Sequence, residues 1–299
     1  PTTGRAPARP TPGITMTTFP SPPCPCLGLR VTVLVENTSR RPDTVGEHGF
    51  AAYVETERGV VLFDTGATGE ALATNARALG VDLARVTAIV LSHGHYDHTG
   101  GLGTALAAAP KAKVYFHWRC TAERWAQRFG FRKAIGMPPQ SRLALDAARR
   151  EPVAGPLLVP EGLLLSGPVP GPTSPAQAGF LTATDAGPRA DDFADETFLL
   201  ARAPSGWVVL TGCCHRGLAN TLAYARVLAG GEPLGAAIGG FHLKRLSRRD
   251  LDDAVEAIRK AGLREVLAGH CTGAKAIRHL AARCGARVEM LEVGLERAW

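Results

Sequence analysis

The sequence predicts an α/β fold in which two β-sheets pack face to face and helices cover their outer surfaces. Two observations support this prediction. Short β-rich runs alternate with helical segments from about residue 69 onward, and the second half of the chain repeats the strand-and-helix rhythm of the first half. Because every sheet and helix must bury its apolar face against another layer, two strand-rich halves that each carry helices favour an αββα arrangement.

The strands expected in the first half are 31–35, 50–54, 60–63, 88–92 and 114–116, and the helices are 70–79 and 102–109. Each strand is a short β-rich run bounded by polar or glycine residues. Residues 129–175 are dense in proline and glycine, with one helix expected at 143–150. This segment is predicted to be an insertion that lies over the core and shapes a pocket.

The strands expected in the second half are 197–200, 207–211, 236–239, 265–268 and 288–293, and the helices are 218–228, 247–260 and 274–282. Ser247, followed three residues later by Asp250, has the pattern of a helix N-terminal capping box. We expect residues 29–299 to form one domain. Residues 1–28 are rich in proline and threonine and are expected to be a disordered arm.

Composition and charge restrict the class of partner. The chain has 299 residues, 45% of them hydrophobic, which is enough to bury a large core. Its formal charge of +7 comes from lysines and arginines scattered along the sequence, which argues against a nucleic-acid groove. The positive charge would still attract an anionic substrate by long-range steering. We therefore expect a small anionic molecule as substrate, and neither nucleic acid nor membrane as partner.

Cysteine usage and hydropathy indicate the compartment. Seven cysteines without even spacing in a chain of this length are typical of reduced thiols and not of a disulfide framework. Residues 1–23 lack the apolar stretch of a signal peptide, and no later segment has the roughly 18 uninterrupted apolar residues of a membrane span. We expect a cytoplasmic protein.

Four candidate metal ligands, His93, His95, Asp97 and His98, fall within six residues directly after an apolar strand. Imidazole nitrogens and carboxylate oxygens are good ligands for zinc, manganese and iron, and the flanking glycines allow a tight turn on which several side chains converge. One histidine on a loop is usually a surface residue, but four ligands in one turn predict a metal site.

Two later histidines occur in the same context of strand, glycine and histidine. His215 follows the strand at 207–211, and His270 follows the strand at 265–268. Each alone is as consistent with a hydrogen-bonded core histidine as with a ligand. The repeated context favours metal ligation for both.

The motif His93-x-His95-x-Asp97-His98, preceded by Asp64-Thr65-Gly66, resembles the metallo-β-lactamase superfamily. Further matches to one branch are Glu47-His48-Gly49, Asn75-Ala76, Gly100-Gly101-Leu102, Asp192 with Asp195-Glu196, Gly212-Cys213-x-His215, Gly239 to Leu243, and His270-Cys271-Thr272-Gly273. That branch is labelled 7,8-dihydropterin-6-ylmethyl-4-(β-D-ribofuranosyl)aminobenzene 5'-phosphate synthase-like. The resemblance covers roughly residues 31–294.

This resemblance implies the αββα sandwich of the metallo-β-lactamase fold, with two divalent metal ions at one edge of the sheets. The ions are expected to be zinc, with manganese and iron also suited to the ligands. His93 and His95 would serve one metal, with His215 as the remaining ligand. Asp97, His98 and His270 would serve the other.

Other site residues follow from the same resemblance or from their context. The strand that delivers a bridging aspartate in many relatives carries cysteines here, so the bridge could be Asp192, Cys213 or a bare hydroxide. Asp64 is expected either to hold a ligating imidazole from outside the metal shell or to cap its own turn. His242 and His48 are assigned to substrate contact.

The function predicted from these features is hydrolysis by a metal-bound hydroxide, with Asp97 both ligating and orienting it. A phosphoester is the preferred substrate class because the chain is basic and the family branch handles phosphorylated ligands. The absence of a flavin-module pattern favours hydrolysis over redox chemistry. Alternatives are a dihydropterin-linked synthase or transferase, a metal-binding sensor protein, and an RNA nuclease, although no long basic arm supports the nuclease.

Overall fold

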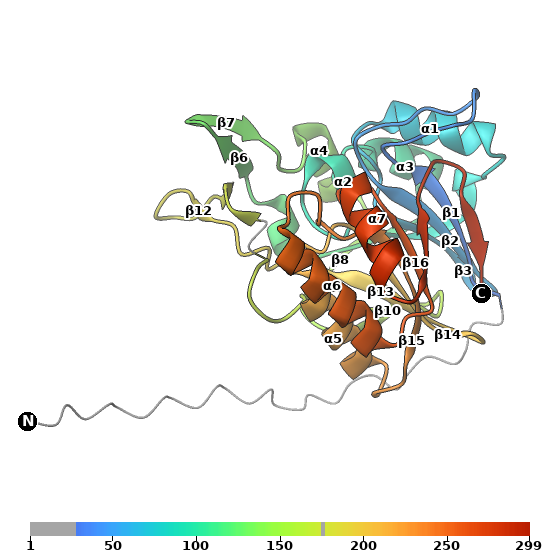
Figure 1. Ribbon diagram of the computed structural model, residues 1–299. Helices are drawn as coiled ribbons and strands as arrows, with labels where there is room; N and C mark the ends of the chain where they lie inside the picture. The colour runs from blue at the N-terminus through green and yellow to red at the C-terminus, as the bar shows by residue number, and fades with distance from the viewer. Residues whose placement is uncertain (1–27, 175–176) are drawn as a thin grey trace, which may run out of the picture.

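The computed structural model describes residues 28–174 and 177–299, so the arm expected at 1–28 lies outside the described residues except for Gly28. The described chain forms two seven-stranded sheets and a separate four-stranded sheet. Figure 1 shows the two large sheets between two groups of helices, with the strands of the small sheet standing apart at one end. The predicted αββα sandwich is confirmed.

The first large sheet has the order β18-β1-β2-β3-β4-β5-β8. Its strands are β1 (Arg30–Val35), β2 (Ala51–Thr56), β3 (Gly59–Phe63), β4 (Val86–Val90), β5 (Lys113–Phe116), β8 (Arg150–Pro152) and β18 (Glu296–Ala298). Strands β1 to β3 are antiparallel, whereas β3, β4, β5 and β8 run parallel. The helices beside this sheet are α1 (Gly69–Ala78), α3 (Leu102–Ala108) and α4 (Pro139–Ala147), and the short α2 (Tyr96–Thr99) follows β4.

The second large sheet has the order β17-β16-β15-β14-β13-β10-β9. Its strands are β9 (Leu157–Leu158), β10 (Leu164–Leu165), β13 (Phe198–Ala203), β14 (Gly206–Thr211), β15 (Leu234–Gly240), β16 (Glu265–Gly269) and β17 (Arg287–Met290). Strands β14 to β17 are parallel and are joined through α5 (Leu218–Leu228), α6 (Arg248–Ala261) and α7 (Ala274–Arg283). Both large sheets thus contain a parallel portion, whose carboxyl-end loops are where α/β sheets usually present ligands.

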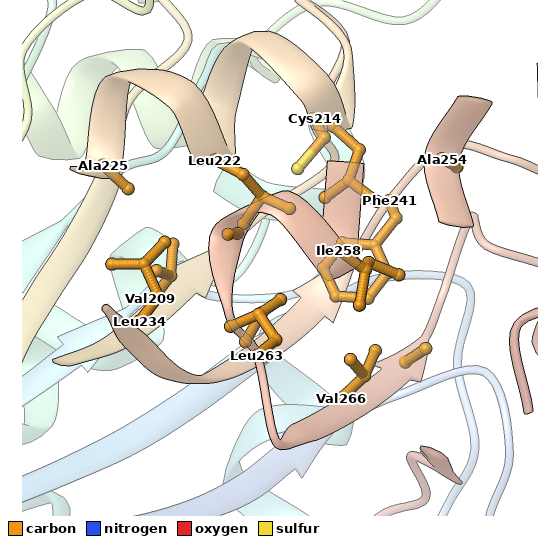
Figure 2. Close-up of a cluster of buried hydrophobic side chains, with 14 of the residues drawn as sticks. Val209, Cys214, Leu222, Ala225, Leu234, Phe241, Ala254, Ile258, Leu263 and Val266 are labelled. Atoms are coloured by element: carbon orange, nitrogen blue, oxygen red, sulfur yellow. The ribbon is translucent and has the colours of Figure 1, made fainter. Parts of the chain in front are cut away.

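The core has one apolar layer on each side of each sheet because strand side chains alternate between the faces. On β14, Val208 and Leu210 pack between the two sheets, while Trp207 and Val209 face the helices. The outer layer is shown in Figure 2, where Leu222 of α5 lies among apolar side chains from the strands and from α6. Burying each such large apolar side chain contributes about 1.5–3 kcal/mol to folding.

Most predicted elements agree with the structure. The helix at 218–228 has the predicted bounds, and the capping box of α6 is formed: the Ser247 hydroxyl accepts from the Asp250 amide at 3.3 Å while the Asp250 carboxylate accepts from the Ser247 amide at 3.2 Å. The helix expected at 143–150 is α4 (Pro139–Ala147), which begins earlier, with a proline in its first turn, and also ends earlier. In the described part of the chain, no helix is both long and apolar enough to cross a membrane.

The expectation that residues 129–175 lie over the core is wrong for the second half of that segment. Strand β8 pairs with β5 at the edge of the first large sheet, and β9 and β10 extend the second. Val159 and Leu163 of this half are fully buried. The proline and glycine density reflects short edge strands joined by tight turns, where proline is tolerated because a ladder hydrogen bond is not required.

The small sheet has the order β12-β11-β6-β7 and was not predicted. Its strands are β6 (Arg124–Arg128), β7 (Phe131–Ala134), β11 (Phe180–Thr182) and β12 (Arg189–Ala190). It connects to the loop after β4 through a β-bridge between His95 and Gly136 and through the Tyr96 amide, which donates to the Ile135 carbonyl at 3.0 Å. This sheet therefore borders the predicted metal site.

Candidate metal centre

The predicted ligands converge because four loops leave the carboxyl ends of parallel strands from both large sheets. The loops follow β4, β14, β15 and β16 and carry, in that order, residues 92–98, 212–216, 241–243 and 270–273. Two glycines permit the close approach: a Cβ on Gly94 would lie 2.0 Å from the Cys120 carbonyl oxygen, and one on Gly212 would lie 2.1 Å from the Ser92 hydroxyl. A side chain at position 94 would require the backbone to shift, and one at position 212 would displace the Ser92 side chain.

The first group of candidate ligands consists of His93, His95 and His215. Their ligand atoms lie within 4.8 Å of one another, and the Nε2 atom of each ring is buried without a hydrogen-bond partner in the described structure. Burial and the charges of neighbouring groups lower the pKa of all three imidazoles well below the usual range. Neutral rings with unpartnered, converging nitrogens are in the state that binds a metal ion.

The other nitrogens of two of these rings are already held. The His93 Nδ1 atom lies 2.9 Å from the Ser92 hydroxyl, and the His215 Nδ1 atom lies 2.7 Å from the Gln177 Oε1 atom. An amide oxygen can only accept, so Gln177 fixes the His215 proton on Nδ1 and leaves Nε2 as a lone-pair donor. Outer partners of this kind are typical of metal-ligating histidines.

The second group surrounds Asp97. Its Oδ2 atom lies 3.3 Å from the His48 Nε2 atom, 3.4 Å from the His270 Nε2 atom and 3.9 Å from the His98 Nε2 atom. The His98 and His270 Nε2 atoms are 3.2 Å apart. Burial and the neighbouring imidazoles lower the pKa of His270 well below the usual range. The structure thus brings Asp97, His98 and His270 together as predicted, and adds His48.

Asp64 organises this half of the site. It is fully buried, and its backbone has a φ of 58°, a left-handed conformation that only a few residue types tolerate. Its Oδ1 atom accepts from the Ser92 amide at 2.7 Å, and its Oδ2 atom lies 2.7 Å from both the Ser92 hydroxyl and the His98 Nδ1 atom. The Asp64 carboxylate therefore hydrogen-bonds to the ligand loop and does not cap its own turn.

The environment of His98 differs from that of the other rings. Burial alone would lower its pKa, but the Asp64 and Asp97 carboxylates outweigh burial and raise the pKa of His98 to about 9. With Asp64 holding Nδ1, the proton that a metal ion would displace is the one on Nε2. The local charge therefore favours a cation at this position.

Cys213 and Asp192, the two candidate bridging residues, lie in different surroundings. The Cys213 Sγ atom is 3.2 Å from the His98 Nε2 atom and forms a group of possible ligands with His93 and His98. Asp192 instead pairs with Arg119 at 3.2 Å and Arg189 at 2.8 Å, and it belongs to none of the groups of possible metal ligands among the described residues. The structure thus brings Cys213, and not Asp192, to the histidines.

The remaining predicted site residue, His242, lies beside the thiols. His242, Cys213 and Cys271 form a further group of possible ligands. The His242 backbone amide donates to the Cys271 Sγ atom at 3.2 Å. The His242 Nδ1 atom is buried without a hydrogen-bond partner in the described structure. His242 and His48 both line the pocket above the site, as expected for residues that contact a substrate.

Several residues that support the site carry no recognisable sequence signal. The buried Arg124 side chain donates to Asp191 at 2.7 Å and pairs with Asp195 at 2.7 Å, and Asp195 in turn accepts from the Gly94 amide at 2.8 Å. This network joins the small sheet to the ligand loop. Of Arg124, Asp191 and Asp195, only Asp195 belongs to a motif of the family branch. No sequence pattern around Arg124 indicates its role.

Two buried glutamates hold the later ligand loops by their backbone. Glu196 accepts from the His215 amide at 2.5 Å and from the Arg216 amide at 2.6 Å, and burial raises its pKa to about 7. Glu36 accepts from the His270 amide, and the Asn37 Oδ1 atom lies 3.1 Å from the His270 Nδ1 atom. The main chains of His215 and His270 are thus each fixed by a carboxylate.

A pocket of about 330 Å³ opens above the second ligand group. It is lined by Asn37, His48, Ala126, Gln127, Arg128, Ala178, Gly179, Phe180, His242, Lys244, Arg245, His270 and Cys271. The wall opposite the ligand loops therefore consists of residues 126–128 and 178–180. These flank the segment 129–175 on either side, so the segment predicted as the cover does not line this pocket, although its residues Ile135 and Gly136 contact the ligand loop.

Comparisons with known proteins agree with this geometry. A family model described as the metallo-β-lactamase superfamily matches residues 45–270. The chain belongs to the metallo-β-lactamase superfamily. Members of this family are mostly metal-dependent hydrolases that bind divalent metals, and the buried, converging imidazole nitrogens of this chain fit such ions.

Two relatives come from Methanocaldococcus jannaschii. The chain is 28% identical to an uncharacterized protein over 256 residues, which cover 84% of this chain and 93% of that protein. It is 25% identical over 252 residues to a 7,8-dihydropterin-6-methyl-4-(β-D-ribofuranosyl)-aminobenzene-5'-phosphate synthase, covering 77% of this chain and 82% of the synthase. The predicted family branch is thereby confirmed as a similarity.

Two solved structures share the fold. Tm1679, described as a metal-dependent hydrolase of the β-lactamase superfamily, superposes with a TM-score of 0.76 at 28% identity, covering 90% of this chain and 98% of Tm1679. The metallo-β-lactamase fold protein YhfI from Bacillus subtilis superposes with a TM-score of 0.56 at 14% identity, covering 91% of this chain and all of YhfI at 100%. The second likeness concerns the fold alone.

Proposed function

We propose that the chain is a metal-dependent hydrolase that cleaves a phosphoester in an anionic small molecule, using two divalent ions for which zinc is the preferred metal. The observation that carries this proposal is the pair of adjoining ligand groups: three buried imidazole nitrogens without hydrogen-bond partners converge in the first, and Asp97 lies among ring nitrogens in the second. A folded protein keeps buried polar atoms unpartnered at a cost, and ligation of a cation removes that cost.

In this proposal His93, His95 and His215 hold one ion, and Asp97, His98 and His270 hold the other. Cys213, whose Sγ atom lies 3.2 Å from the His98 Nε2 atom, would be available as a further ligand. When bound, the ions would supply a Lewis acid for the phosphoryl oxygens and would lower the pKa of a coordinated water.

The chain's own side chains would orient the attacking water and give a proton to the leaving group. The Asp97 Oδ2 atom lies 3.3 to 3.9 Å from the Nε2 atoms of three histidines, and Asp97 would also orient the attacking water by hydrogen bonding. His48 is 58% exposed at its side chain, stacks on His270 with ring centroids 5.2 Å apart and contacts Asp97. It is therefore positioned to meet the substrate and to give a proton to the departing alcohol oxygen, so that water is added across the P–O bond.

The test is a substrate screen with protein of measured metal content. Zinc-loaded protein is expected to hydrolyse at least one phosphomonoester or phosphodiester, to lose that activity with a chelator and to regain it on zinc addition. Lactones serve as comparison substrates. A pure, metal-loaded protein that releases no phosphate or alcohol from any phosphoester contradicts the proposal.

A second candidate, synthesis of a dihydropterin-linked ribofuranosylaminobenzene phosphate, is favoured by the 25% identical relative that carries this name. The same metal-loaded protein would then convert a dihydropterin substrate while leaving simple phosphoesters intact. Chromatography of the two reaction mixtures separates the candidates.

A further inference from the structure

Three cations line the pocket above the ligands without an acidic counterpart. Arg128 lies at the end of β6, and Lys244 and Arg245 follow β15 on the other side. No aspartate or glutamate is among the described residues that line this pocket, and none of the three cations has an ion pair with a described residue. The pocket mouth therefore carries uncompensated positive charge.

Several other arginines at the small sheet have carboxylate partners. Arg124 pairs with two buried carboxylates, and Arg119 and Arg189 both pair with Asp192. Arg132 of β7 has no carboxylate partner either, but it lies outside the pocket lining and its Nε atom donates to the Gln127 Oε1 atom. At the pocket, three unpaired cations lie together with no acidic residue among the described lining residues, which is the pattern expected where a ligand supplies the negative charge.

The cations also lie at a defined place relative to the chemistry. Lys244 and Arg245 come two and three residues after His242, and Arg128 comes from the opposite wall beside Phe180. The Phe180 ring lies 5.7 Å from the His95 ring and 5.9 Å from the His242 ring, measured between centroids. A ligand that reaches from the histidines to the cations would therefore pass along an aromatic face.

We propose that Arg128, Lys244 and Arg245 form a subsite for a second phosphate group of the substrate, remote from the bond that is cleaved, with a sugar or flat ring between the two groups lying against Phe180. This inference rests on the proposed phosphoesterase function for the identity of the reaction. The anion subsite itself depends only on the pocket and its three cations. It is a specificity determinant and not part of the machinery that breaks the bond.

The experiment compares two esters that differ in one group: thymidine 5'-(p-nitrophenyl phosphate) with and without a 3'-phosphate. Release of p-nitrophenol is followed in the zinc-loaded wild type and in the variant R128Q/K244Q/R245Q. The control is R77Q/K111Q/R278Q, which removes three exposed, unpaired cations from elsewhere and so has the same net charge. The control therefore separates the effect of net charge from that of charge at the pocket.

The wild type is expected to show a KM about tenfold to a hundredfold lower for the 3'-phosphorylated ester, as several charge-assisted contacts would give. The pocket variant should lose this preference while keeping kcat and KM for the ester without the 3'-phosphate. The control variant should retain the preference. A pocket variant that discriminates as well as the wild type overturns the proposal.

A binding measurement keeps the two proposals separable if neither ester is cleaved. In that case the phosphoesterase proposal fails, and calorimetry of ribose 5-phosphate against ribose with the zinc-loaded proteins decides the subsite. A tenfold or greater loss of ribose 5-phosphate affinity in the pocket variant alone supports it. Equal affinity in the wild type and the pocket variant means that phosphate binds elsewhere, for example at the ions, and overturns it.

Discussion

Asp64→Asn should weaken metal binding while leaving the fold nearly intact, because the change alters hydrogen bonding and not shape. Asparagine is among the few residues that tolerate the left-handed backbone found here, at a φ of 58°. The aspartate accepts one bond at Oδ1, from the Ser92 amide, and shares Oδ2 between the Ser92 hydroxyl and His98, all at 2.7 Å. An amide has only one oxygen, so one of the two acceptor oxygens of Asp64 is replaced by an NH₂ group that donates.

With the amide oxygen facing the Ser92 backbone, the new NH₂ group points at His98 Nδ1. That nitrogen must then accept, so its proton moves to Nε2, the atom that lies 3.2 Å from the His270 ring nitrogen and is needed for the metal. Loss of an outer partner of a ligating histidine typically costs about 10–100-fold in metal affinity. This corresponds to roughly 1.4–2.7 kcal/mol.

The assay is competition for Zn²⁺ with a chromophoric chelator, together with urea unfolding of the metal-free protein. The control is Asp252→Asn, which alters an aspartate that pairs with His279 at 2.7 Å on the surface of α6 and α7. We expect the control to bind zinc as the wild type does. Zinc affinity of Asp64→Asn within twofold of the wild type would refute the assignment of Asp64 as the residue that sets the His98 tautomer.

Four further outcomes are expected. His95→Ala should lose bound metal and turnover, measured by elemental analysis and assay, whereas His279→Ala should retain both. Asp97→Asn should lower kcat more than it raises KM, since it affects the attacking water and leaves the pocket in place; a pure KM effect would contradict this role. Arg124→Met should destabilise the fold by about 3–5 kcal/mol in urea, because it leaves two buried carboxylates without their cation. Burial raises the folded-state pKa of Glu196 to about 7 from 4.5, so its stabilising protonated form is fully present below pH 4.5 and is lost as the pH rises through 7. In metal-free Glu196→Gln that part of the pH dependence should be absent, and an unchanged stability profile would count against it.

The sequence was sufficient to predict the central strands of both large sheets and the ligand cluster because these depend on local patterns, whereas it missed the short strands β8, β9, β10 and β18. Strand β14 alternates residues for the two sides of its sheet, and His93 to His98 follow β4 within one turn. Period-2 burial and strand-end placement can both be identified in a window of a few residues. Predictions based on such windows agree with the structure even where bounds shift by a few positions.

The small sheet and the pocket wall could not be predicted in the same way. Its strands β6 and β11 are separated by about fifty residues of sequence, and Trp125 pairs with Leu181 across that distance. Most side chains of β7 are exposed, so no apolar alternation marks it. The connection to the ligand loop depends on Arg124, whose partners Asp191 and Asp195 are recognisable only once the chain is folded.

The origin of the ligands in both large sheets has a consequence for unfolding. His93, His95, Asp97 and His98 follow a strand of one sheet, whereas His215 and His270 follow strands of the other. Ions bound here would act as crosslinks between the two halves of the sandwich, in addition to the apolar contacts between the sheets and polar contacts such as that of Glu36 with the His270 amide. Zinc at 100 times its dissociation constant would add about 2.7 kcal/mol. Because neither half can separate without releasing an ion, metal-loaded protein should unfold in one concerted step, and a chelator should allow the halves to open independently.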